Sequence, residues 1–148
     1  MNIFILDNNP RLAAQQHCDK HVPKMILESA QMLSTVLGGP YKPTHKNHPC
    51  TKWVAESRQN AAWLGQLMYW LNEEYKWRFN KGEDHLAYYK CGYLTNTNIL
   101  DQLPDIGQTP FAQAMPDEHK NDDAVTAYRA YYRTKEFAEW RKGAPAWW

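Results

Sequence analysis

Two histidines stand four residues apart near the start of the chain, and the residues around them carry charge. The run His17-Cys18-Asp19-Lys20-His21 is followed by Lys24 and Glu28, in a stretch that otherwise has the spacing of an apolar core helix. Plotted at 100° per residue, its polar residues fall on one narrow arc opposite a wide apolar face. They are His17, His21, Lys24, Glu28, Gln31 and Thr35. The arc either meets water, as in an ordinary amphipathic helix, or lines a pocket.

Acid–base catalysis without a metal is one chemistry that these residues suit. A histidine that titrates near neutrality can take a proton from water or a hydroxyl, and a second can protonate a leaving oxygen. Lysine and arginine side chains could neutralise a phosphate in the transition state, and a carboxylate could orient an imidazole. Such an arrangement suits phosphodiester cleavage. The residues predicted to be catalytic are His17, His21, Asp19 and Glu28.

Metal binding is the alternative use of the same histidines. On one helix, the i, i+4 spacing lets two imidazoles meet one ion, and His45, His48 or Cys50 could supply a third ligand. The glutamate of the HExxH metalloprotease pattern is absent. A divalent metal held by His17 and His21 therefore stays an open alternative, and the sequence requires no cofactor.

Aromatic residues are abundant, with seven Trp and nine Tyr. Most of these rings should pack in the core, but some could stack on a nucleobase. A polar stripe with two indoles is either a helix edge folded onto the core or the opposite wall of a site. The residues predicted to bind a ligand are Asp7, Lys20, Lys24, His45, His48, Trp53, Glu56, Asn60, Trp63 and Arg129.

Helices would position all of these residues, because apolar side chains recur at helical spacing between breaks rich in Gly, Pro, Asn and Asp. The predicted elements are a short strand or extended segment at 2–6, helices at about 10–21, 23–37, 51–79, 85–94 and 121–133, an irregular stretch at 95–116, and a final turn or two at 135–142. Pro23 either kinks the first helix or opens the second. The sequence predicts an all-α fold: a single compact helical domain over residues 1–148, with at most one short N-terminal strand.

Charge and composition limit the classes of partner. The chain has 17 Lys and Arg against 16 Asp and Glu, so long nucleic acid is disfavoured as the main ligand, whereas a small nucleotide-derived anion is compatible. Three widely spaced cysteines indicate a reducing compartment. With no signal-peptide pattern and no apolar run near the roughly 20 residues of a membrane span, we expect a cytoplasmic protein without a membrane partner. A homo-oligomer is compatible with the sequence.

Four segments together resemble a family of short, mostly uncharacterised bacteriophage proteins, some of which are labelled pyrimidine-dimer DNA glycosylases. The segments are Asn2–Asp7, His17–Met25, His45–Cys50 and Asp123–Tyr132, with His-Cys-Asp-Lys-His as the most specific part. The resemblance covers the whole chain. A base-excision enzyme of that type would use an amine nucleophile. By analogy, the chain is also similar to phage proteins that cleave or sequester the nucleotide signals of host immune systems.

Three functional hypotheses follow. The leading one is a phage-type hydrolase that binds a small nucleotide-derived ligand and cleaves its phosphodiester bond. The second is a protein that sequesters such a ligand without chemistry and so counters host defence. The third is a DNA glycosylase that acts on damaged pyrimidines.

Overall fold

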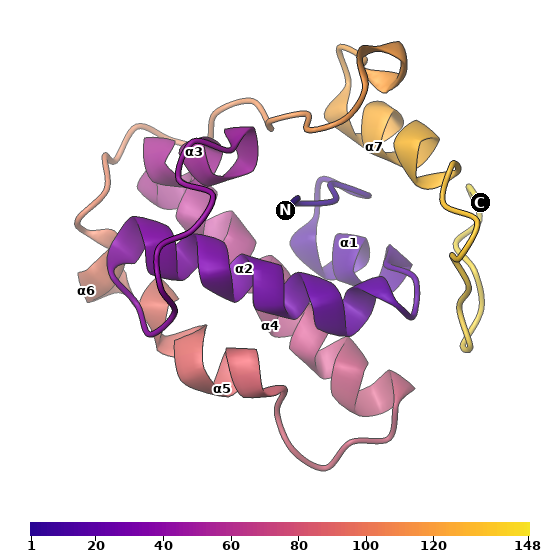
Figure 1. Ribbon diagram of the computed structural model, residues 1–148, viewed down its shortest axis with the longest axis horizontal. Helices are drawn as coiled ribbons and strands as arrows, with labels where there is room; N and C mark the ends of the chain where they lie inside the picture. The colour runs from indigo at the N-terminus through magenta and orange to yellow at the C-terminus, as the bar shows by residue number, and fades with distance from the viewer.

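The computed structural model describes residues 1–148 and contains seven α-helices, two 3₁₀ helices and no β-strand. In chain order the elements are α1 (Pro10–Gln16), α2 (His21–Leu37), α3 (Pro49–Glu56), α4 (Arg58–Arg78), α5 (Leu86–Cys91), η1 (Gly92–Thr95), α6 (Thr97–Leu100), η2 (Asp117–His119) and α7 (Ala124–Tyr132). Helix α4 packs against α1 and α2, and α2 also contacts α3 and α5 (Figure 1). The all-α prediction is confirmed.

Helix α1 ends before His17, so the two histidines do not share one helix as the sequence interpretation required. His17 follows α1 as its C-terminal cap with extended backbone angles (φ −65°, ψ 137°), and α2 begins only at His21. Pro23 lies in the first turn of α2, where its missing N–H costs no hydrogen bond. It therefore opens the second helix, and Gly38 at φ 77° ends that helix.

The single long helix expected over 51–79 is two helices, α3 and α4, separated at Ser57. The backbone of Ser57 is extended (φ −153°, ψ 154°), and its hydroxyl accepts the N–H of Asn60 at 3.0 Å. Serine is favoured at this N-cap position because it satisfies one of the unpaired amides of the first turn. Apolar periodicity continues across the cap, so periodicity alone predicts one helix.

The N-terminal segment is buried but forms no strand. Ile3, Phe4, Ile5 and Leu6 are each at most 4% exposed, and no neighbouring strand is present to pair with them. Instead, the Leu6 carbonyl accepts a hydrogen bond from Arg129 Nε of α7 at 2.9 Å. Figure 1 shows this segment between the middle helices and α7, so that residues from the first and last parts of the sequence pack together.

The C-terminal residues after α7 contain turns but no further helix, so the helical turn expected over 135–142 is absent. Two indoles nevertheless dock this segment on the end of α1. Trp140 Nε1 donates to the Gln16 carbonyl at 2.9 Å, and Trp147 Nε1 donates to the Gln16 side-chain oxygen at 2.8 Å. The stretch 95–116, expected to be irregular, contains α6.

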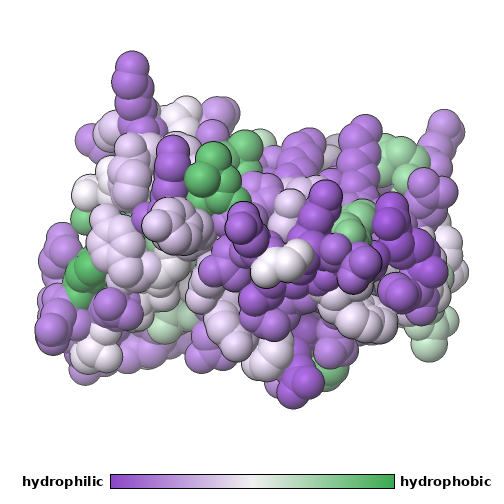
Figure 2. All heavy atoms as spheres, turned by 90° about the horizontal axis from the view of Figure 1, so that it is seen from below, coloured by the Kyte–Doolittle hydropathy of each residue, from purple (hydrophilic) through white to green (hydrophobic).

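No helix combines the length and the apolar character that crossing a membrane would require. Figure 2 shows the face seen from below as mostly hydrophilic, with apolar residues in small separate spots. That face therefore has no broad apolar surface of the kind that marks a large protein interface.

Candidate active site

The α-amino group of Met1 and the carboxylate of Glu28 form an ion pair in a largely enclosed setting. Met1 N lies 3.4 Å from Oε1 of Glu28, and the two side chains are 2% and 11% exposed. The same oxygen accepts the main-chain N–H of Asn2 at 2.9 Å. Met1 as a whole is only partly buried, so its accessible surface belongs mainly to its main chain, which carries the amine.

Asn2 fixes the position of this amine, because its side chain contacts three other segments of the chain. Its Oδ1 accepts the main-chain N–H of Ile3 at 2.8 Å. The same oxygen accepts hydrogen bonds from the Tyr128 hydroxyl at 3.1 Å and from Cys50 Sγ at 3.5 Å. Its Nδ2 donates to the Ala114 carbonyl at 2.9 Å. Segments from α3, the 109–116 stretch and α7 thus hold the first residues against α2.

His48 and Cys50 lie next to the Met1–Glu28 pair at the start of α3. The Nδ1 of His48 accepts the Cys50 N–H at 3.1 Å and so caps the helix. Burial lowers the pKa of His48, and the positive Met1 amine and His45 lower it further. Burial raises the pKa of the Cys50 thiol to about 11. The thiol therefore stays protonated at neutral pH, so the amine, once it has lost its proton, is the nucleophile available at this point.

His17 and His21, predicted as acid and base, lie in the core instead of on a pocket wall. They are 0% and 2% exposed, and the His21 ring stacks on Phe4 with centroids 4.6 Å apart. Desolvation lowers the pKa of His17 to about 4 and that of His21 to about 3. Both are therefore neutral at physiological pH, and their burial keeps a ligand from reaching them.

Hydrogen bonds fix the tautomers of these two rings. His17 Nδ1 lies 2.7 Å from the Ala13 carbonyl, an acceptor, so Nδ1 carries the proton. The Tyr132 hydroxyl accepts the Cys18 N–H at 2.9 Å and can then donate to His21 Nδ1 at 2.8 Å. This Tyr132 contact ties α7 to the start of α2.

The proposed metal ligands do not assemble into a site. No group of three or more His, Cys, Asp or Glu side chains is arranged to hold an ion. His17 Nε2 is buried without a hydrogen-bond partner, whereas His45 is exposed and bonded to Thr44. The spacing argument assumed one continuous helix, and the break before His21 removes that assumption.

The remaining acidic candidates near the histidines hold the fold together. Asp19 pairs with Arg78 at 3.3 Å and with Arg141 at 3.6 Å. Asp7 pairs with Arg129 at 3.6 Å, and that arginine also holds the Leu6 carbonyl. Arg129, which was predicted to bind a phosphate, instead holds the N-terminal segment through these two contacts.

The 104–116 stretch is held in place by four residues predicted to bind a ligand, namely Trp53, Glu56, Asn60 and Trp63. Trp53 Nε1 donates to the Thr109 carbonyl at 3.2 Å, while Asn60 and Glu56 bond the Thr109 hydroxyl. The two indoles are buried and contact edge to face at 6.2 Å. The indoles of Trp53 and Trp63 pack against each other and against Phe111, so neither has a free face on which a nucleobase could stack.

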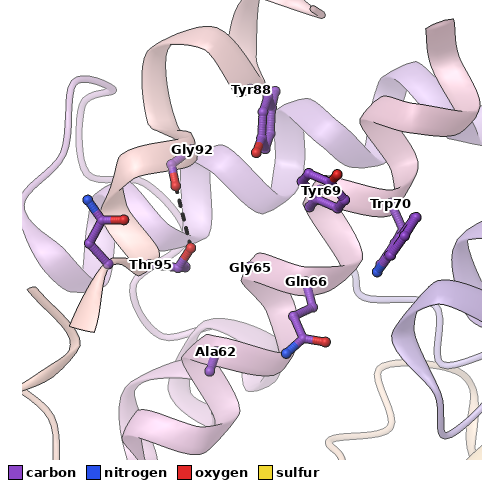
Figure 3. Close-up of a pocket in the computed structure, with 9 residues that line it drawn as sticks. Ala62, Gly65, Gln66, Tyr69, Trp70, Tyr88, Gly92 and Thr95 are labelled. Atoms are coloured by element: carbon purple, nitrogen blue, oxygen red, sulfur yellow. Dashed lines mark hydrogen bonds between the residues drawn. The ribbon is translucent and has the colours of Figure 1, made fainter.

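A separate hollow of about 510 Å³ lies between α4, α5 and η1, where sequence reasoning placed no site (Figure 3). The rings of Tyr69, Trp70 and Tyr88 line it with the amides of Gln66 and Asn96, and no charged side chain contributes. This hollow could take a planar neutral group.

The Met1 amine is the feature that sequence reasoning missed, although the glutamate that faces it was singled out. The sequence placed Glu28 on the polar arc of its helix, whereas the structure buries it, and a buried carboxylate requires a positive partner. The sequence offered no means of telling which cation that would be, because the contact joins residues 27 positions apart through the fold.

These observations define an all-helical protein with a main-chain amine held against a buried glutamate on its central helix. The family described as "Pyrimidine dimer DNA glycosylase" matches residues 1–86, more than half of the chain, and the chain belongs to that family. The matched range includes Met1, Glu28 and His48. No curated protein and no solved structure matches the chain.

Proposed function

We propose that the protein is a DNA glycosylase that acts on damaged pyrimidines, with the Met1 amine as nucleophile and Glu28 as its proton acceptor. The observation that carries this proposal is the 3.4 Å contact between Met1 N and Glu28 Oε1 in an enclosed site. An amine can form a covalent imine with a sugar carbon, which is the chemistry of base excision by this route. The family description supports the same substrate class.

The proposed reaction uses both groups in one displacement. The deprotonated amine attacks C1′ of the damaged nucleotide, the N–C1′ bond forms, and the glycosidic bond breaks with its electron pair leaving on the base. Glu28 takes the proton that the amine loses on attack and passes it to the departing base, which leaves protonated. Opening of the sugar ring then moves the second amine proton to O4′ and gives the imine. A carboxylate within direct reach of the amine is the geometry that such proton transfer needs.

The local charge also favours DNA, although the whole-chain charge was expected to disfavour it. Between residues 20 and 55 there are five lysines and one acidic residue, Glu28, a net charge of +4 against +1 for the whole chain. This segment comprises α2, the loop after it and most of α3, the elements beside Met1. A protein whose net charge is nearly zero can still bind a polyanion when its basic residues gather on one face.

The residues that were predicted to cleave a phosphodiester bond are not available for that reaction. His17 and His21 were its acid and base, and both are buried and neutral at physiological pH. Arg129, one of its phosphate ligands, is engaged by Asp7 and the Leu6 carbonyl.

Borohydride trapping tests the proposed glycosylase directly. The purified protein is incubated with a labelled duplex containing one thymine dimer, sodium borohydride is added, and the covalent complex is resolved by denaturing electrophoresis. We expect a trapped species whose DNA-bearing peptide, identified by mass spectrometry, contains Met1. Undamaged duplex of the same sequence serves as the substrate control.

A change that blocks the amine separates this mechanism from non-specific trapping. A variant with two residues added before Met1 should bind DNA but give no adduct, because its amine no longer lies beside Glu28. Lys90→Gln, which removes a lysine of α5, should trap normally. An adduct on Lys135, or unchanged trapping by the extended chain, would overturn the role of Met1.

Capture of a small nucleotide-derived ligand is a second candidate function, supported by the hollow in Figure 3. Three rings could stack on a base and two amides could bond its edge, but no cation is present there for a phosphate. Because Trp70 lines the hollow, titration with adenosine or thymidine should change tryptophan fluorescence, and Gln66→Ala should weaken the response. An unchanged spectrum at millimolar nucleoside would exclude this candidate.

A further inference from the structure

Three lysines converge near the start of α2 without an acidic partner. Lys20 and Lys24 belong to the cap and first turns of α2, and Lys135 follows α7. None of the three takes part in the ion pairs of the structure, and the nearest carboxylate in sequence, Asp19, is engaged by Arg78 and Arg141. Their positive charges are therefore not neutralised by the protein itself.

Aromatic rings hold the ammonium groups of Lys20 and Lys135 in place. Lys135 Nζ lies 4.3 Å from the ring centre of Tyr131 and 5.3 Å from that of Phe4. Lys20 Nζ lies 4.6 Å from the ring of Phe137, which Lys135 also faces at 6.0 Å. Ring faces attract ammonium groups, and they restrict side chains that are normally mobile. Lys20 and Lys135 thus face the same exposed phenylalanine, Phe137.

The arrangement is electrostatically unfavourable without a bound anion. Burial lowers the pKa of Lys135, and the nearby charge of Lys24 lowers it further. Lys135, Lys24 and Lys20 each also lower the pKa of the neighbouring His21. Like charges held this close repel each other, and an anion between them would replace repulsion with attraction.

We propose that Lys20, Lys24 and Lys135 bind a phosphate group of the DNA backbone beside the Met1–Glu28 site. Lys24 precedes Glu28 by four residues on α2, so the two are about one helical turn apart, roughly 6 Å along the axis. A phosphate held there lies next to the nucleotide on which the amine acts. This inference rests on the proposed function for its choice of DNA, but its own evidence is the unpaired lysine cluster.

The salt dependence of DNA binding tests this site without requiring catalysis. Dissociation constants for a fluorescein-labelled undamaged duplex are measured by anisotropy at several KCl concentrations. Each phosphate contact contributes about 0.9 to the slope of log Kd against log salt. Because the site holds one phosphate, we expect the Lys24→Gln/Lys135→Gln variant to lower that slope by about 1.

Lys90→Gln/Lys142→Gln is the matched control, since these lysines also face single rings, those of Tyr41 and Trp77, without an acidic partner. It should leave the slope unchanged. An unchanged slope in the Lys24/Lys135 variant, or an equal fall in the control, would overturn the site. Circular dichroism of each variant shows that a changed slope does not come from unfolding.

Inorganic phosphate distinguishes a DNA site from one for a free anion. Tm is measured in sodium phosphate against sodium chloride at equal ionic strength. Stabilisation by phosphate that disappears in Lys24→Gln/Lys135→Gln, together with an unchanged DNA slope, would assign the cluster to a free anion and overturn the DNA assignment. If the slope falls but wild-type protein traps no damaged DNA, the phosphate site holds and the glycosylase proposal fails. If wild-type protein traps damaged DNA but the slope of the variant is unchanged, the glycosylase proposal holds and the phosphate site fails.

Discussion

One carboxylate oxygen of Glu28 faces two main-chain nitrogens, those of Met1 at 3.4 Å and Asn2 at 2.9 Å. The Asn2 contact is a hydrogen bond that positions the chain, and the Met1 contact pairs opposite charges. The two roles can be separated by mutation, because an amide oxygen still accepts a hydrogen bond but carries no charge and takes no proton.

Glu28→Gln should therefore keep the fold and lose the reaction. The side-chain amide oxygen of this variant would still accept the Asn2 N–H, while proton transfer from the amine would be lost. General-base catalysis contributes about 10²–10⁴-fold, so we expect the rate of adduct formation with dimer-containing duplex to fall by at least about 100-fold. Glu136→Gln, on the exposed surface, should react at the wild-type rate. Equal rates for both variants would remove Glu28 from the mechanism.

The two buried histidines should make the protein less stable as the pH falls. Their folded-state pKa values of about 4 and about 3 lie below the unfolded value of 6.5, so the unfolded chain binds protons first. The free energy of unfolding should fall from about pH 6.5 downward, by up to about 1.4 kcal/mol per pH unit for each histidine. Urea unfolding at pH values from 7 to 4.5 measures this slope.

His21→Gln should lower stability at pH 7 but give a shallower pH dependence, because one of the two linked groups is gone. His45→Gln removes an exposed histidine and should leave the slope as in the wild type. A His21→Gln protein with the full wild-type slope would show that His21 is protonated in the folded state.

Arg78 should be the costliest single charge to remove, since it joins α4 to the junction of α1 and α2. Its guanidinium is 3% exposed and donates to the His17 carbonyl at 2.6 Å and the Gln15 carbonyl at 3.2 Å, and it pairs with Asp19 and Glu74. Arg78→Met leaves these carboxylates without their main cation, which costs about 3–5 kcal/mol for a buried pair. Urea unfolding measures the loss.

Lys120→Gln is the control for Arg78→Met, because it removes an ion pair whose acidic partner, Asp117, is 95% exposed. Such surface pairs contribute about 0–1 kcal/mol. If Arg78→Met proves no more destabilising than Lys120→Gln, the junction is held by packing alone.

Local sequence rules predicted the fold class and most helices, because caps, breakers and apolar spacing act within a few residues. The break at Ser57 and the start of α2 near Pro23 depend on which of two local solutions tertiary packing favours. The candidate site was harder to predict, since its partners lie far apart in the chain. Glu28 was identified as part of the polar arc of its helix, but the Met1 amine and Lys135 reach their places through contacts between segments that are far apart in the chain.

Gly65 offers a test of the packing between α4 and η1 that shapes the hollow in Figure 3. A Cβ there would overlap Thr95 Cγ2 and lie 2.7 Å from Thr95 Oγ1. Gly65→Ala should gain about 1 kcal/mol in helix propensity but lose about 1–3 kcal/mol to the clash, giving a net loss of stability. In a Thr95→Gly background the clash is absent, so the same substitution should stabilise the protein. Urea unfolding of the four proteins measures this change of sign, and stabilisation by Gly65→Ala in the wild-type background would contradict the close approach of these elements.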